Sequence, residues 1–114
     1  MIAVVFEVFP KSDQRDAYLA MAADMRALVE TIDGFISVER FESLTTPGKL
    51  LSLSFWRDEA ALDEWRALAG HRKAQTAGRE IMFDDYRLRV VSVMRDYGMT
   101  ERAEAPADSR ALHG

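Results

Sequence analysis

The segment Ile2–Phe9 constrains the fold most strongly, because it is apolar on both of its faces. It is rich in β-branched and aromatic residues and is closed by Pro10, which predicts a strand. Side chains of a strand alternate between its two faces, and only Glu7 interrupts the apolar pattern. An antiparallel sheet with one wet face would alternate apolar with polar residues, so this strand needs cover on both sides.

The rest of the chain alternates between helical and strand-like patterns. A long amphipathic helix is expected to begin at Ser12 or Asp13, its candidate N-caps, and to end at Asp33-Gly34. The remaining predicted elements are strands at Phe35–Ser43 and Leu50–Trp56 around a Pro-Gly turn, a helix capped by Asp58 and broken at Gly70, a helical stretch from His71 to about Met82, and a strand at Asp84–Tyr97.

This order of elements predicts a ferredoxin-like βαββαβ fold of the α+β class, with a four-stranded antiparallel sheet. The helices cover one face of such a sheet, so we expect a second copy of the chain to cover the other, as a homodimer. The composition changes after Gly98, which predicts one domain over residues 1–98 and a C-terminal tail over residues 99–114.

Composition excludes several classes of site. The 114 residues include no cysteine, which rules out disulfide scaffolds, thiolate nucleophiles and cysteine-bound metal clusters. The net charge of −4 disfavours a nucleic-acid partner. The two histidines, His71 and His113, are too few for a multi-histidine metal site. No signal peptide or membrane span is recognisable, so we expect a cytoplasmic protein without a membrane partner.

Four residues suggest a ligand pocket between sheet and helices. His71 and Gln75 share one helix face with small residues, and Trp65 precedes that face by one helical segment. Glu7 would have a raised pKa, suited to a general base, if its carboxylate points into a pocket. Each also has a simpler interpretation: Trp65 as a core residue, His71 and Gln75 as exposed polar residues, and Glu7 as the ion-pair partner of a strand arginine.

Several longer stretches resemble a known family. They are Gly34–Phe41, Lys49–Ala60, Trp65-Arg66 leading to His71–Gln75, and Asp85–Val90. The string Phe-Trp-Arg-Asp-Glu-Ala, followed by a Trp and then a His, is similar to the antibiotic biosynthesis monooxygenase family. The resemblance spans about residues 1–98 and implies a dimeric α+β barrel, in which two sheets pack face to face.

The resemblance also implies an activity. Some members of the family oxidise polycyclic phenols with molecular oxygen and without metal or flavin, in a pocket between sheet and helices. This implies a cofactor-independent monooxygenase acting on a small aromatic or quinol-like substrate. Glu7, His71 and Gln75 would be its catalytic residues, and Trp65 and Tyr86 would bind the substrate.

Two other functions stay open. Haem-degrading members use an Asn on the first strand, a Trp on the second helix and a His ligand. Here Trp65 matches the Trp, but Glu7 stands near the Asn position and Gln75 near the ligand position, with His71 one turn earlier. Gln is a poor iron ligand beside imidazole, so haem is the less favoured alternative. The third function is a non-catalytic dimeric domain that binds a small ligand.

Overall fold

The computed structural model describes residues 1–68 and 82–114. The helical stretch expected from His71 onward falls between these two ranges, outside the described residues. The elements are β1 (Ile2–Pro10), α1 (Arg15–Val29), β2 (Phe35–Glu42), β3 (Leu50–Trp56), α2 (Glu59–Ala67), β4 (Phe83–Ser92) and α4 (Ala107–His113).

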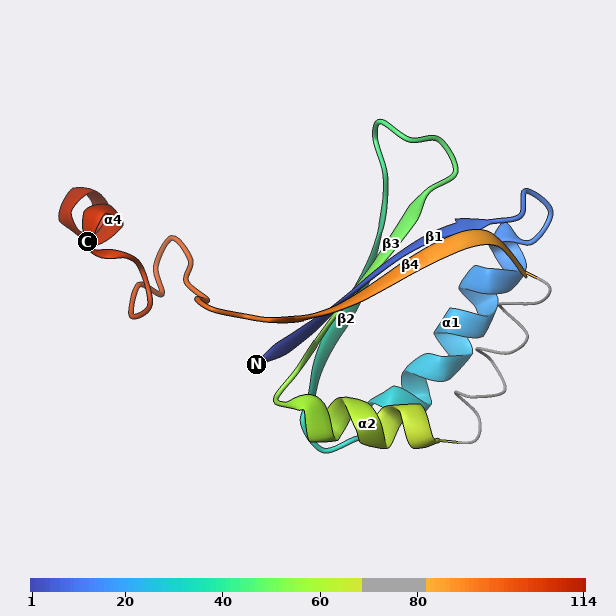
Figure 1. The fold of residues 1–114 in the computed structure, drawn as a ribbon, viewed down its shortest axis with the longest axis horizontal. Coiled ribbons are helices and arrows are strands. Elements are labelled where there is room, and N and C mark those ends of the chain that lie inside the picture. Colours follow the sequence, from blue (N-terminus) through green and yellow to red (C-terminus); the bar gives the residue numbers. More distant parts are fainter. Residues whose placement is uncertain (69–81) are drawn as a thin grey trace.

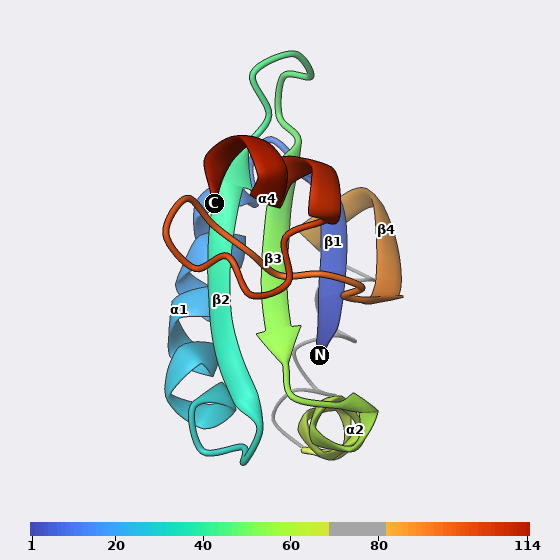
Figure 2. The ribbon, with the colours of Figure 1, turned by 90° about the vertical axis from the view of Figure 1, so that its left-hand side faces the viewer.

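The strands form one antiparallel sheet in the order β2-β3-β1-β4, and α1 and α2 lie on the same side of it (Figure 1). This arrangement confirms the predicted ferredoxin-like α+β fold. We call the other side of the sheet the open face, because neither α1 nor α2 covers it. Figure 2 shows this face behind the C-terminal segment. Its apolar side chains include Val5, Phe41, Leu53, Phe55 and Val91.

The core lies between the helices and the inner face of the sheet. Val4 and Val8 of β1 are buried there, and Val8 and Trp56 are the largest side chains with almost no exposure among the described residues. Val4 stands opposite Ser54 of β3 and Val90 of β4, so β1 places its inner side chains at the centre of the sheet. We found no helix among the described segments long and apolar enough to cross a membrane.

The ends of α1 differ from the prediction. Its first residue is Arg15 and its N-cap is Gln14, whose side chain makes no capping hydrogen bond, so the expected caps at Ser12 or Asp13 were wrong. A backbone turn, in which the Gln14 N–H donates to the Lys11 carbonyl at 2.8 Å, precedes the helix and delays its start. By contrast, the predicted cap of α2 is confirmed.

Asp58 caps α2 with its carboxylate. Its Oδ1 accepts a hydrogen bond from the Ala61 N–H at 2.9 Å. This bond satisfies one of the free donors in the first turn of the helix. The carboxylate is also bonded to Arg57, and together these contacts lower the pKa of Asp58. The cap therefore fixes where α2 leaves β3, and with it the direction of Trp65 on that helix.

A β-bulge at the start of β2 changes which side chains face the helices. Phe35 is opposite Trp56, but the register shifts before Ser37, so that Val38 is opposite Ser54. Because of the extra residue, every later side chain of β2 lies on the face opposite to the one that simple alternation from Phe35 predicts. Phe35, Val38 and Arg40 therefore all point inward.

The C-terminal segment leaves the sheet after Ser92, earlier than the predicted strand end at Tyr97. It projects on the open-face side and ends in the short helix α4 (Figures 1 and 2). Arg102 holds it together, donating to the carbonyls of Gly98 and Gly114 at 3.1 Å each. The division into a domain and a tail stays a prediction.

We predict that Gly34→Ala destabilises the fold more than Gly48→Ala. Both glycines have positive φ, +93° and +80°, which costs any other residue roughly 1–2 kcal/mol. A Cβ at Gly34 would also lie 2.8 Å from the Ala61 Cβ, whereas one at Gly48 meets nothing within 4 Å. Urea unfolding should show a loss of about 2–4 kcal/mol for Gly34→Ala. Equal losses for the two variants would contradict a close approach of Gly34 to α2.

Candidate functional site

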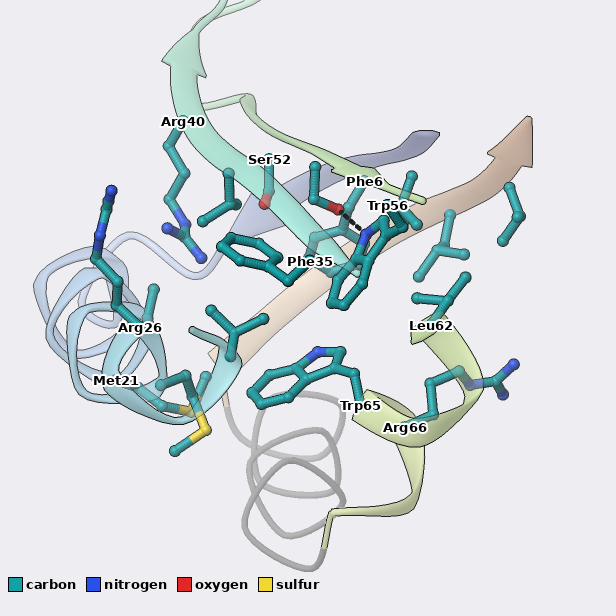
Figure 3. A pocket seen from close by; sticks show the side chains of 18 of the residues that line it. Phe6, Met21, Arg26, Phe35, Arg40, Ser52, Trp56, Leu62, Trp65 and Arg66 are labelled. Atoms are coloured by element: carbon teal, nitrogen blue, oxygen red, sulfur yellow. Dashed lines mark hydrogen bonds between the residues drawn. The ribbon is translucent and has the colours of Figure 1, made fainter. Parts of the chain in front are cut away.

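A cavity of about 270 Å³ lies between the inner face of the sheet and the helices α1 and α2 (Figure 3). It is slightly smaller than the range of roughly 300–1,000 Å³ common for ligand pockets. The strands β1 to β4 and the helices α1 and α2 all contribute to its wall. Its aromatic lining residues, within the described part of the chain, are Phe6, Tyr18, Phe35, Trp56, Trp65 and Phe83.

Trp56 forms a fixed part of the wall. Its indole Nε1 donates to the Ser54 hydroxyl at 2.9 Å, and Phe35 packs edge-on against it with ring centroids 5.2 Å apart. The indole is 2% exposed, so its one polar atom is satisfied within the wall. Trp56 therefore presents a rigid apolar surface to the cavity.

Trp65 lines the same cavity from α2 (Figure 3). It is 8% exposed and packs in the hydrophobic cluster that includes Val4 and Trp56. Trp65 is thus a core residue and a pocket residue at once. Its role in binding substrate stays a prediction, and its position in the wall is consistent with that role.

Tyr86 is not one of the residues that line the cavity. Its ring packs against Phe6 and Phe83, with centroids 5.6 Å and 6.0 Å away, and both of those rings line the cavity. Tyr86 itself is 41% exposed. It supports two lining rings, and direct contact with substrate stays a prediction.

Glu7 lies on the open face, on the opposite side of the sheet from the cavity. Its partners across the sheet are Leu51 and Arg87, whereas its neighbour Phe6 lines the cavity. The Glu7 carboxylate pairs with Arg89 at 3.0 Å and with Lys49 at 3.2 Å. Hydrogen bonds from Arg89 and then Lys49 lower the pKa of Glu7.

The condition for a raised pKa, a Glu7 carboxylate that points into the pocket, is therefore not met, and the alternative ion pair with a strand arginine is confirmed. The sequence pattern could not settle this point, because β1 is apolar on both faces. Its strict alternation shows that Glu7 and Phe6 point to opposite sides, but not which side the helices cover. A general base facing the open face has no access to a substrate in the cavity.

His71 and Gln75 lie outside the described residues, so their catalytic roles stay predictions. Among the described residues that line the cavity there is no Asp, Glu or His. The described ranges also contain no group of three or more His, Cys, Asp or Glu residues that could bind a metal ion. The described wall is suited to binding an apolar molecule and keeping water away from it.

Arginines interrupt this apolar wall; those in the described ranges are Arg26, Arg40 and Arg66 (Figure 3). Arg26 pairs on the surface with Glu30 at 3.2 Å. Arg40 comes from β2, and its Nε is buried with no hydrogen-bond partner among the described residues. The sequence pattern gives no sign of this placement, because simple alternation from Phe35 puts Arg40 on the other face. Only the bulge turns it inward.

Comparison with known proteins adds a family and a relative. Residues 1–77 match the family model described as antibiotic biosynthesis monooxygenase. The protein named Jasmonate monooxygenase ABM from Pyricularia oryzae is 50% identical over 93 residues, which are 82% of this chain. The aligned region is 43% of that relative's own length, so this chain spans less than half of it.

Solved structures share the fold. Rv0793 from Mycobacterium tuberculosis superposes with a TM-score of 0.75 at 24% identity, over 85% of this chain and 98% of that one. A mutant of SnoaB from Streptomyces nogalater, described as a cofactor-independent oxygenase, has a TM-score of 0.72 at 14% identity. That match covers 83% of this chain and 94% of SnoaB.

We predict that Glu7→Gln changes stability and leaves turnover nearly intact. A lowered pKa means that the carboxylate stabilises the fold above pH 4.5, its ordinary value, and that this contribution disappears as the pH falls through the lowered value. The stability gap between wild type and Glu7→Gln should therefore be present at pH 7 and close in acid. Chemical unfolding at several pH values measures it.

Turnover of the same variant separates the two roles of Glu7. Loss of a general base costs roughly 10²–10⁴-fold in rate. An ion pair on the opposite face predicts a kcat within about twofold of wild type. A roughly 10²-fold or greater loss of kcat in a folded Glu7→Gln protein would instead support Glu7 as the general base.

Proposed function

Because this chain belongs to the antibiotic biosynthesis monooxygenase family, we propose that it oxidises a small ring-containing substrate with molecular oxygen in the cavity beneath α1 and α2. The observation that carries the proposal is the cavity itself. It combines a wall of aromatic side chains with a position between sheet and helices. An apolar, water-poor site protects a reactive anion or radical of the substrate from side reactions.

The described residues account for binding and orientation. Phe35, Trp56 and Trp65 offer flat surfaces to a ring, and Trp56 is held by its bond to Ser54. Offset or edge-on contacts with such rings orient a substrate as well as bury it. For the chemistry we retain His71 as the proposed base and Gln75 as a hydrogen-bonding group for the substrate, on the sequence pattern alone.

The reaction balances without a resident cofactor for one class of substrate. Conversion of an activated methylene to a carbonyl, R2CH2 + O2 → R2CO + H2O, takes all its electrons from the substrate. Hydroxylation of an unactivated position instead needs two electrons and two protons from a reductant. The name of the Pyricularia relative makes jasmonate a second test compound, in assays with and without NADPH as reductant.

Oxygen uptake tests the proposal. We expect anthrone, which has an activated methylene, to be converted to the quinone with one O2 consumed per product. Val90 lines the cavity, so Val90→Phe should narrow it and lower kcat/KM by about tenfold or more. Leu44→Phe, at a fully exposed turn position, is the matched control and should change nothing.

The outcomes separate the candidate functions. No uptake above the no-enzyme rate with anthrone or jasmonate, with or without NADPH, would contradict the proposed oxygenase. Uptake that depends on added haem, with a saturable Soret band, would support the haem alternative instead. Equal rates for Val90→Phe and Leu44→Phe would place the reaction outside this cavity.

We also propose that a second copy of the chain covers the open face. Phe41 and Val91 on that face are 43% and 40% exposed, and Val5, Leu53 and Phe55 lie between them. Exposed apolar side chains gathered on one face of a sheet are typical of a buried interface. The projecting C-terminal segment lies on the same side and would contact the partner (Figure 2).

Light scattering tests the dimer. We expect twice the 12.9 kDa mass of the chain at micromolar concentration. Phe41→Asp places a charge in the patch and should shift the protein to the monomer mass, whereas Leu44→Asp in the exposed turn should not. A monomer mass for the wild type at these concentrations would refute the proposed interface.

A further inference from the structure

Arg40 is a feature of the cavity that binding an apolar ring does not explain. It comes from β2, directly opposite Ser52 of β3, and both side chains line the cavity. In Figure 3 the Arg40 guanidinium enters beside Phe35 and Ser52, while the Arg66 side chain extends away at the far side. Arg40 and Ser52 therefore sit together at one end of an otherwise aromatic space.

The buried Nε–H of Arg40 has no acceptor within the described residues. A buried donor without a partner carries its full desolvation cost, and more so when it belongs to a charged group. Native proteins rarely leave such a donor unpaired, and a catalytic role or a bound ion is among the recognised reasons. A bound anion would supply the missing acceptor.

The size and polarity of the cavity identify the class of anion. Arg40 offers a planar fork of donors, which matches a carboxylate with two parallel hydrogen bonds. Arg26 already pairs with Glu30, so the described wall does not offer the cluster of free cations that a phosphate dianion favours. The rest of the cavity is apolar and fits a compact hydrocarbon body.

We propose that this site selects small carboxylic acids, with the carboxylate on Arg40 and Ser52 and the apolar body against Phe35, Trp56 and Trp65. The inference rests on the proposed function only in taking this cavity as the substrate site. Arg40 would then determine specificity, and the apolar end of the substrate would lie away from β2.

Binding of matched acids and amides tests the inference. The probes are naphthaleneacetic acid and cyclohexylpropionic acid, each paired with its neutral primary amide, titrated by calorimetry without oxygen. We expect each acid to bind wild type roughly 10- to 100-fold more tightly than its amide. Arg40→Gln should abolish that preference and Arg40→Lys should retain part of it, whereas Arg110→Gln, in α4 and outside the cavity wall, should leave it unchanged.

Stability of the empty protein gives a second readout. A structural arginine loses stabilising contacts when replaced, whereas Arg40→Gln removes a buried unpaired donor and should hold or raise the thermal midpoint. A clear fall in the midpoint, with acid preference retained, would make Arg40 a structural residue. Equal binding of acid and amide by wild type, or binding of neither, would overturn the inference.

The two proposals fail separately. Tight, Arg40-dependent binding of acids without oxygen uptake on any substrate would refute the oxygenase and leave the carboxylate site. Oxygen uptake on neutral substrates, unchanged by Arg40→Gln and with no preference for acids, would refute the carboxylate site alone.

Discussion

The pairing of β1 on both of its edges is the constraint on which the rest of the structure depends. Because β3 and β4 flank it, β1 is central, and its alternate side chains supply both faces of the sheet. Phe6 reaches the cavity, and Glu7, the next residue, holds an ion-pair network on the open face. The cavity and the open face thus draw on a single strand, and neither face can change register without moving the other.

Much of the fold could be predicted because its signals are local. The β-branched run of β1, the Pro-Gly turn before β3 and the carboxylate of Asp58 each act over a few residues. The ends of α1 could not be predicted in this way. A backbone turn after Lys11 delayed its start, and the helix stopped at Val29, ahead of the glycine expected to end it.

The candidate site was less predictable, since it depends on which face each strand presents. Trp65 was found from its helical spacing, and it does line the cavity. Glu7 was assigned a role that required it to face inward, and a strand that is apolar on both sides gives no sign of direction. Arg40 was missed because alternation counted from Phe35 fails at the bulge, which is set by the pairing of β2 with β3.

The bulge in β2 has a consequence for how this pocket could diverge among related chains. Deleting Ile36 would remove the extra residue and leave Arg40 opposite Ser52, so a chain one residue shorter here would keep its inward cation. Regular pairing at unchanged length would instead place Glu39 opposite Ser52 and turn Arg40 to the open face. Relatives with an identical set of residues in this strand could therefore accept molecules of opposite charge, depending only on whether the strand bulges.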